Sequence, residues 1–299
     1  MKHLKDIGED ALIARLIKGL GKGADLVVGP GDDCAVVDVG DELRYQLLKT
    51  DCIVEGVHYL PDAPAQKVGW KAIARVISDF AAMGGIPSQL LVTLVMPESQ
   101  QVEYVEALYE GMQKCATEYG ATISGGETSS LPTGSATVIS IAGTGWVNKD
   151  QLVRRDGGKP GDVILVTGML GGSIKGKHLT FTPRVKEARW LVENFSMTSM
   201  MDLSDGVAKD LPRLAKLSAC GYQINEQAVP CSQGSDLAGA LGDGEDYELL
   251  FTVRADVLED LLQKWDIEFP ELSLTAIGEL TDAESAPLTL GRGWEHFTS

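Results

Sequence analysis

The sequence predicts a protein of two domains that mix helices and strands, of the α/β and α+β classes. Its 299 residues correspond to about two domains of average size. Segments with helical periodicity alternate with short apolar segments typical of strands along both halves. A polar stretch that contains glycine and proline, residues 148–161, separates the halves. We therefore expect an N-terminal domain over residues 1–148 and a C-terminal α+β domain over residues 149–299.

The N-terminal half begins with a helix that is followed by strands. Apolar residues at helical spacing predict a helix over residues 10–20, which ends at Gly21. Two longer helices are predicted over residues 63–83, before a Gly-Gly-Ile-Pro stop, and over residues 101–119, where one side is apolar. Short apolar or β-branched runs between turn residues predict strands over residues 26–28, 35–39, 44–50, 89–95, 121–124 and 136–147.

The C-terminal half repeats the alternation with fewer elements. Apolar runs predict strands over residues 162–167, 247–254 and 272–279. Helical spacing predicts helices over residues 183–194, 206–217 and 255–265.

The composition narrows the partners and the location. The formal net charge is −17, and nucleic acids or anionic membranes bind clusters of Lys and Arg, so we expect neither as a partner. The five cysteines form no CxxC pair, which favours reduced thiols. The N-terminal segment is charged throughout, unlike a signal peptide, and no apolar run reaches the roughly 20 residues that span a bilayer. We expect a cytoplasmic protein.

Carboxylates gather at the ends of predicted strands and in loops. Each one alone could be a turn residue, a helix cap or a solvated charge. Asp79 is different because its neighbours in the helix are apolar, and an unpaired buried carboxylate is costly. Several acids that converge would repel one another unless cations lay between them, and oxygen ligands of this kind suit Mg²⁺. The acids in question are Asp32, Asp33, Asp51, Asp79, Glu127, Asp202, Asp205, Glu245 and Asp246.

Four other features have two readings each. The glycine-rich residues 168–176 lack the Walker lysine, so they are either a turn or a phosphate contact. His58 is either a surface residue or a ligand contact. Arg154 and Arg155 either neutralise a triphosphate or face solvent. Trp294 either packs in the core or stacks on an aromatic substrate.

Nine segments in order resemble the thiamine-monophosphate kinase family. The wider superfamily includes aminoimidazole ribonucleotide synthetase, selenophosphate synthetase and a hydrogenase-maturation dehydratase, and the segments GEDYELLF and EGVHY favour the thiamine branch. The nine segments are GPGDDCAVV, TDCIVEGVHY, SDFAAMGGIP, GGETS, GKPGDVILVTGMLGGS, TPRV, MDLSDGVAKDL, GEDYELLFT and GWEHF.

The resemblance implies a fold and a set of site residues. The fold is the two-domain fold of aminoimidazole ribonucleotide synthetase, with an N-terminal mixed sheet used for dimerisation, so a homodimer is expected. The choice between Asp32 and Asp33, and that between Arg154 and Arg155, stays open. Implied Mg²⁺ ligands are Asp32, Asp33, Thr50, Asp51, Asp79, Glu127, Asp202 and Asp205; implied ATP contacts are Gly126, Glu127, Arg154 and Ser204; implied thiamine monophosphate contacts are His58, Glu245 and Trp294.

The implied activity is the Mg²⁺-dependent transfer of a phosphoryl group from ATP to thiamine monophosphate. The chain departs from the family pattern at Glu127, where Asp is usual, at Lys49, where a small hydroxyl residue is common, and at residues 171–173. The stretch before Pro183 is also short. Two alternatives follow: another ATP-using enzyme of the superfamily, or a non-catalytic nucleotide-binding descendant. The Glu127 substitution leaves the second alternative open, and the many retained acids count against it.

Overall fold

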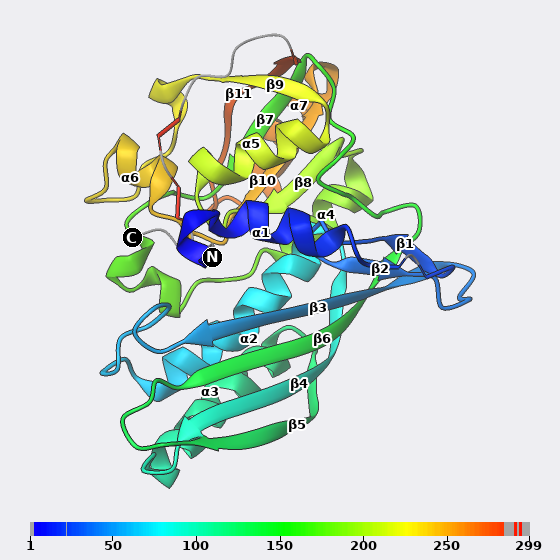
Figure 1. Cartoon of the computed structure of the whole chain (residues 1–299). Helices are drawn as coiled ribbons and strands as arrows, with labels where there is room; N and C mark the ends of the chain where they lie inside the picture. The colour runs from blue at the N-terminus through cyan, green and yellow to red at the C-terminus, as the bar shows by residue number, and fades with distance from the viewer. Residues whose placement is uncertain (1–2, 22, 284–289, 292, 295–299) are drawn as a thin grey trace.

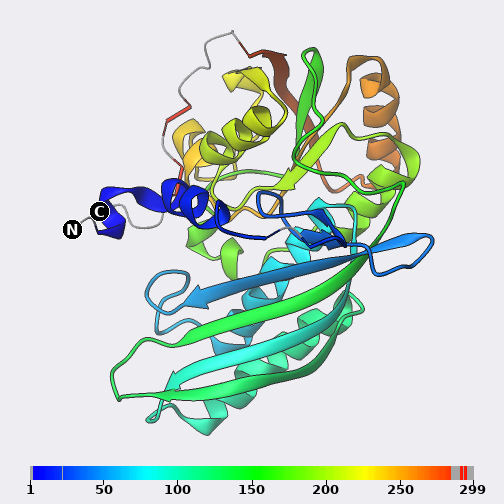
Figure 2. The same ribbon diagram turned by 45° about the vertical axis from the view of Figure 1, so that its right-hand side comes forward.

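A computed structural model of the chain describes residues 3–21, 23–283, 290–291 and 293–294. Two sheets organise the fold, one in each half of the chain, and Figure 2 shows the second sheet and its helices stacked above the first. The predicted mixture of α/β and α+β structure is confirmed. Among the described residues, no helix combines the length and apolar composition that a membrane span requires.

The first sheet is mixed and has helices on one face only. Its six strands lie in the order β1-β2-β3-β6-β4-β5, and only the pair β4 and β5 is parallel. The helices α2 and α3 cover one face, and the face toward the viewer in Figure 1 carries no helix. The strands are β1 (Leu26–Val28), β2 (Ala35–Val37), β3 (Arg44–Val54), β4 (Ile86–Pro97), β5 (Thr122–Leu131) and β6 (Val138–Asn148); the helices are α2 (Ala65–Ala82) and α3 (Val102–Glu118).

The second sheet is antiparallel and lies between two layers of helices. Its order is β8-β10-β7-β11-β9. Ile164 and Val166 pack with α5 and α6, whereas Leu165 between them packs with α4 and α7, as strand alternation requires. The strands are β7 (Asp162–Thr167), β8 (Ser199–Asp202), β9 (Cys220–Ile224), β10 (Leu249–Arg254) and β11 (Leu274–Asp282); the helices are α4 (Val185–Asn194), α5 (Val207–Leu217), α6 (Leu237–Gly242) and α7 (Leu258–Glu268).

The N-terminal helix α1 (Gly8–Ile17) lies against the second half. Glu9 and Asp10 reach α5, where they pair with Lys209 at 3.1 Å and with Arg213 at 2.9 Å. Single 3₁₀ turns occupy Leu4–Asp6, Ser173–Lys175, Lys177–Leu179, Glu226–Ala228 and Ala255–Val257.

Strand β5 differs most from its prediction. The sequence predicts that it ends at residue 124, but it continues through Gly125, Gly126 and Glu127 to Leu131. The strand β5 is an exposed edge strand, so it needs no alternation of apolar residues. Its small polar residues therefore give no strand pattern in the sequence. A side chain at position 126 would place its Cβ 1.9 Å from the Val92 carbonyl oxygen, so glycine is required there.

Candidate functional site

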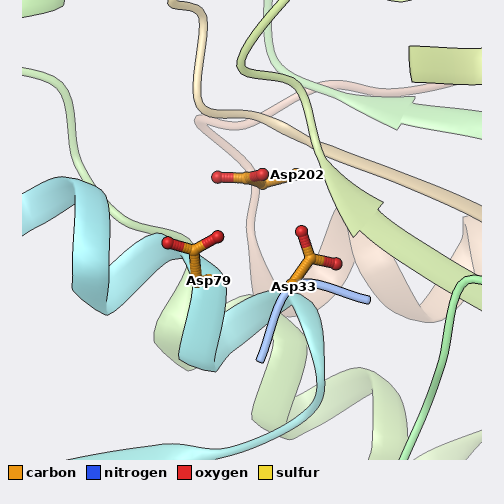
Figure 3. Close-up of side chains that lie close together, drawn as sticks. All are labelled: Asp33, Asp79 and Asp202. Atoms are coloured by element: carbon orange, nitrogen blue, oxygen red, sulfur yellow. The ribbon is translucent and has the colours of Figure 1, made fainter. Parts of the chain in front are cut away.

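Three buried aspartates from distant segments meet where the two halves of the chain join. Asp33 precedes β2, Asp79 lies in the last turn of α2, and Asp202 ends β8. One carboxylate oxygen from each lies within 4.8 Å of the other two, and Figure 3 shows the three groups facing one another. Their exposed fractions are only 2%, 6% and 3%. We call Asp33, Asp79 and Asp202 the acid triad.

Each carboxylate of the acid triad accepts a hydrogen bond from a protein donor. Arg155 donates to Asp33, from Nη2 at 2.5 Å and from Nε at 3.2 Å. The Lys49 ammonium donates to Asp79 at 2.7 Å. The Ser78 hydroxyl donates to Asp202 at 2.5 Å. Carboxylate lone pairs therefore remain for a further cation, since each carboxylate has about four acceptor positions.

The electrostatics of the acid triad favour a bound cation. Burial, followed by the charge of Asp33, raises the pKa of Asp202 to about 6. Burial also raises the pKa of Asp79 well above its ordinary value, against the opposing effect of Lys49. Burial and the neighbouring carboxylates thus outweigh the effect of Lys49 and Arg155 on these pKa values, and a further cation would offset the repulsion that remains. Buried oxygen ligands in this number fit Mg²⁺, which uses a few carboxylates and completes its shell with water and phosphate.

Two further predicted acids lie beside the acid triad. Asp32 accepts from the backbone N–H groups of Asp33 and Arg155. Burial and the neighbouring Asp33 raise the pKa of Asp32 to about 6. Asp51, on β3, pairs with Arg75 of α2 at 3.0 Å. Asp51 shares a face of the sheet with Lys49, because side chains two apart on a strand point the same way.

Helix α2 carries three charged residues on one side. Lys71, Arg75 and Asp79 are spaced by four positions, so they lie in a row along the helix. The Lys71 ammonium is fully buried and donates to both oxygens of Glu245, at 2.8 and 2.7 Å. Arg75 donates to the Cys52 carbonyl at 3.1 Å, and its guanidinium lies 6.0 Å from the centre of the Tyr247 ring. One helix therefore links the acid triad to a second group of residues.

Arg75, Glu245 and Tyr247 of this second group line a cavity of about 170 Å³. Its walls combine cations, carboxylates and aromatic rings, which is the composition of a site for a charged aromatic ligand. The predicted residues His58, Ser204, Asp205, Glu245 and Trp294 all contribute to it. The lining residues are Val57, His58, Arg75, Ile174, Ser204, Asp205, Asp243, Glu245, Tyr247 and Trp294.

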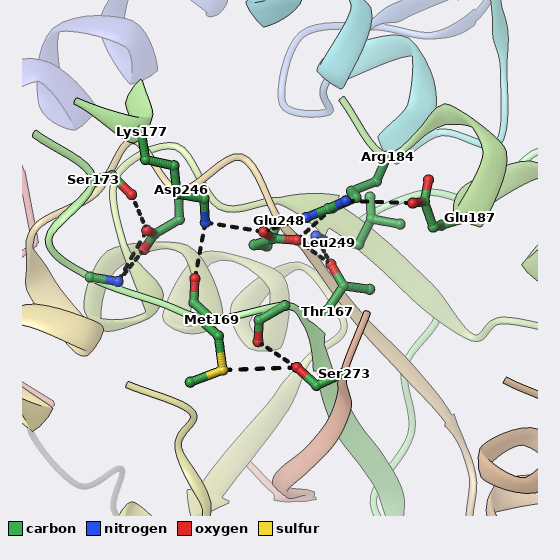
Figure 4. A network of polar contacts seen from close by, with 12 residues as sticks. Thr167, Met169, Ser173, Lys177, Arg184, Glu187, Asp246, Glu248, Leu249 and Ser273 are labelled. Carbon is green, nitrogen blue, oxygen red and sulfur yellow. Dashed lines mark hydrogen bonds and ion pairs between the residues drawn. The ribbon is translucent and has the colours of Figure 1, made fainter. Parts of the chain in front are cut away.

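The segment from Glu245 to Glu248 positions the cavity residues by alternation. Glu245 and Tyr247 line the cavity, and both adopt positive φ angles, 57° and 50°. Asp246 and Glu248 point inward and fix the segment, as Figure 4 shows. Glu248 accepts from Arg184 at 2.7 and 2.8 Å, from Lys177 at 3.1 Å and from Thr167 at 2.8 Å. Such bonds offset the backbone strain of a positive φ.

The glycine-rich loop is held by carboxylates. The Gly171 N–H donates to both oxygens of Asp246 at 3.0 Å, and the Gly172 N–H donates to Asp243 at 2.8 Å. The Ser173 hydroxyl also bonds Asp246. These donors would otherwise be free to bind phosphate, so the loop acts here as a support for the cavity wall.

Asp205, Ser204 and Trp294 are joined at the edge of the cavity. Asp205 pairs with Arg213 at 2.6 Å and with Lys209 at 3.1 Å, and its carbonyl accepts from the Trp294 N–H at 3.0 Å. The Ser204 carbonyl accepts from the Glu245 N–H at 2.7 Å. The Trp294 side chain is 48% exposed. Glu295, His296 and Phe297 of the GWEHF segment lie outside the described residues.

Within one chain, four predicted residues lie neither at the acid triad nor at the cavity. The Thr50 side chain lies on the open face of the first sheet, beside Leu48 and Leu91. Gly126 and Glu127 lie on the edge strand β5, three strands away from β3, or about 14 Å at the usual strand spacing. Arg154 is exposed and pairs with Asp156 at 2.8 Å, while Arg155 reaches the acid triad.

The functional residues that sequence reasoning missed are cations. The sequence does carry a signal for Lys71 and Arg75. They are charged residues four positions apart, and they lie on the apolar side of a predicted helix. In the sequence, Lys49 is only a departure from the family pattern, and Arg155 is only the alternative to Arg154. Their partners lie 30 and 122 positions away in the sequence, so no local pattern reveals the pairing.

Comparisons with known proteins show what the chain is similar to. The N-terminal domain of AIR synthase related proteins matches residues 31–147. The chain is 36% identical to the thiamine-monophosphate kinase of Rhodopirellula baltica over 77% of each chain. It is 31% identical to the thiamine-monophosphate kinase of Salmonella typhimurium, covering 98% of this chain and 99% of that one. The solved structure of AaThiL complexed with AMPPCP and TMP matches at 30% identity with a TM-score of 0.84, covering 99% of both chains.

Proposed function

Because the chain belongs to the thiamine-monophosphate kinase family, we propose that it transfers the γ-phosphoryl group of ATP to thiamine monophosphate. The observation that carries this proposal is the row of charges on α2. Asp79 of the acid triad and Lys71 at the cavity are eight residues apart, about 12 Å along the helix. We assign the Asp79 end of this row to the phosphates of ATP with their Mg²⁺, and the Lys71 end to the organic acceptor.

The reaction needs alignment and charge neutralisation more than a strong base. An oxygen of the thiamine phosphate attacks the γ-phosphorus, the bond from that phosphorus to the β,γ-bridging oxygen breaks, and ADP and thiamine diphosphate leave. The attacking phosphate is mostly ionised at neutral pH, so catalysis reduces to positioning. Arg75 lies between Asp51 and the cavity, where its guanidinium can balance charge on the incoming phosphates.

The residues proposed to hold Mg²⁺ are those predicted from the sequence. The acid triad, Asp32 and Asp51 form the buried core of the set, and Asp205 lies at the cavity edge. When bound, Mg²⁺ would offset the repulsion between the two substrates and stabilise charge on the transferring group. The remaining proposed Mg²⁺ ligands are Thr50 and Glu127. The proposed ATP contacts are Gly126, Glu127, Arg154 and Ser204.

Thiamine monophosphate is proposed to bind in the cavity. Glu245 faces it with a negative charge that complements a thiazolium cation, and Trp294 adds an aromatic ring to the same lining. His58 lines the same wall, and its Nδ1 accepts the Val54 N–H at 3.0 Å. That bond fixes the orientation of the imidazole.

We further propose that two copies pair through the open face of the first sheet. Leu48 and Leu91 are 39% and 50% exposed there, as expected of a face that a partner covers. A two-fold axis along the strands would lay β5 of one copy over β2 and β3 of the other. Glu127 of each copy would then serve the acid triad of the other, which accounts for its distance from the triad in one chain.

The remaining proposals concern organisation and surroundings. We propose an N-terminal domain over residues 1–148, a C-terminal domain over residues 149–299, and a cytoplasmic location. The net charge of −17 supports the absence of nucleic acid and membrane partners.

A direct assay tests the proposed function. Purified protein with Mg-ATP and thiamine monophosphate is expected to form thiamine diphosphate and ADP in equal amounts. The Asp79→Asn variant is expected to remain folded by circular dichroism and to lose turnover. Calorimetric ATP binding without any thiamine diphosphate would favour a non-catalytic descendant, and ADP release with a different acceptor would favour another enzyme of the superfamily.

A further inference from the structure

Lys49 lies inside the acidic cluster as a fixed positive charge. Strand β3 directs Lys49 and Asp51 to the face that α2 covers, and the Lys49 ammonium lies 2.7 Å from an oxygen of Asp79. The side chains of Lys49 and Asp79 are only 22% and 9% exposed. An ion pair this sheltered from water is weakly screened and holds its position.

Two cationic side chains of the protein itself therefore contact the acid triad. Lys49 contacts Asp79, and Arg155 contacts Asp33. When ionised, three carboxylates with two such partners carry one uncompensated negative charge, where the same carboxylates alone would carry three. Fewer divalent ions are needed to neutralise a cluster that already contains ammonium and guanidinium groups.

The Lys49 ammonium and a divalent metal ion exclude each other at this point of the acidic cluster. An ammonium group offers three donors and no lone pair, so it cannot ligate a metal ion. A serine at position 49 would remove the charge, open the space that the lysine stem fills, and supply a hydroxyl oxygen, which is a ligand type that Mg²⁺ accepts.

We propose that the ammonium of Lys49 takes the place of one divalent cation in the acidic cluster, so that this chain binds one fewer Mg²⁺ than it would with serine at position 49. Lys49 is thus a positioning residue that holds Asp79 in place of a metal. The inference rests on the proposed magnesium site, and it does not depend on which acceptor is phosphorylated.

Ion counting tests the inference without any turnover. Mn²⁺, a paramagnetic probe for Mg²⁺, is titrated in the presence of AMPPCP, and bound ions per chain are counted by electron paramagnetic resonance. Four proteins are compared: the wild type, Lys49→Ser, Lys49→Arg and the control Lys149→Ser. Lys149 also pairs with an aspartate, Asp38 at 3.2 Å, but it lies outside the cluster. Circular dichroism establishes that each variant is folded.

The expected result is one additional Mn²⁺ in Lys49→Ser and an unchanged count in the other two variants. In buffer with chelator, Lys49→Ser is expected to melt below the wild type, and added Mg²⁺ should raise its Tm by more than it raises that of the wild type. Equal ion counts in the wild type and Lys49→Ser would overturn the proposed role of Lys49 but leave the magnesium site standing. A wild type that binds no Mn²⁺ would overturn the magnesium site, and this inference with it.

Discussion

The ammonium of Lys71 holds both oxygens of Glu245, although the two residues are 174 positions apart in the sequence. Lys71 is completely buried, and its ammonium also donates to the His58 carbonyl at 2.5 Å. One cation on α2 thus fixes two segments of the cavity wall that come from different halves of the chain.

Replacing Lys71 is expected to weaken the binding of thiamine monophosphate selectively. Lys71→Met leaves the Glu245 carboxylate without its partner, so the KM for thiamine monophosphate should rise by about tenfold or more, a loss of at least about 1.4 kcal/mol. The KM for ATP should change little. Steady-state kinetics with each substrate varied in turn makes the comparison, and Lys67→Met, at an exposed position one turn earlier on α2, is the control. An equal rise in both KM values would count against this role.

The same contact predicts a pH dependence of substrate binding. Burial lowers the pKa of Lys71 from 10.5 to about 8, against the opposing effect of Glu245. As the pH rises through 8, the ammonium loses its proton and Glu245 loses its partner, so the KM for thiamine monophosphate should climb. A KM that stays flat up to pH 10 in the wild type would contradict the prediction.

Stability does not account for that expected change in KM. The unfolded chain keeps the Lys71 proton up to about pH 10.5, so the contribution of this group to the free energy of unfolding increases with pH between 8 and 10.5. Lys71→Arg keeps its charge throughout the range and should show no break near pH 8. A break at the same pH in both proteins would assign it to another group.

Trp294→Ala is expected to separate stacking from packing. The side chain is 48% exposed, so its loss should change the free energy of unfolding by no more than about 1 kcal/mol. If the ring stacks on the acceptor, the KM for thiamine monophosphate should rise far more than that for ATP. Thermal melts and kinetics on one preparation give both values, and a large drop in Tm without a KM effect would show that the ring only packs.

Mixed dimers test whether Glu127 serves the second copy. Glu127→Ala and Asp79→Asn are each expected to be inactive, because every site in those proteins lacks one group. After unfolding and refolding together, half of the dimers contain one chain of each kind, and one of their two sites has both groups. Activity should recover to about a quarter of the wild-type value. The control mixture of Asp79→Asn with Asp202→Asn should stay inactive, and so should the first mixture if Glu127 acts within its own chain.

The elements that the sequence predicts well are those with a strong local pattern. Helix α2 is predicted within two residues because an apolar side ends at two glycines, and β7 is predicted to the residue because its apolar run is bounded by polar turns. The strand β8 was missed, since Ser199–Asp202 is too short to show a period. In the sequence, Asp79 stands out because its neighbours are apolar, whereas Asp33 and Asp202 are two of several acids at strand ends and in loops.

Partnerships across the chain could not be predicted in the same way. Lys49 with Asp79 and Lys71 with Glu245 are matched by how the sheets and α2 pack, which no local periodicity encodes. Arg154 and Arg155 have equal standing in the sequence, and only the direction of the chain after residue 153 decides that Arg155 enters the cluster.

Because the acid triad draws one member from each of three segments, it has consequences during synthesis. A nascent chain that has folded only its first sheet contains Asp33 and Asp79, but Asp202 and Glu245 are still inside the ribosome or not yet translated. Such a fragment has neither the complete acid triad nor the Glu245 wall of the cavity. The proposed site therefore comes together only when the second sheet closes over α2.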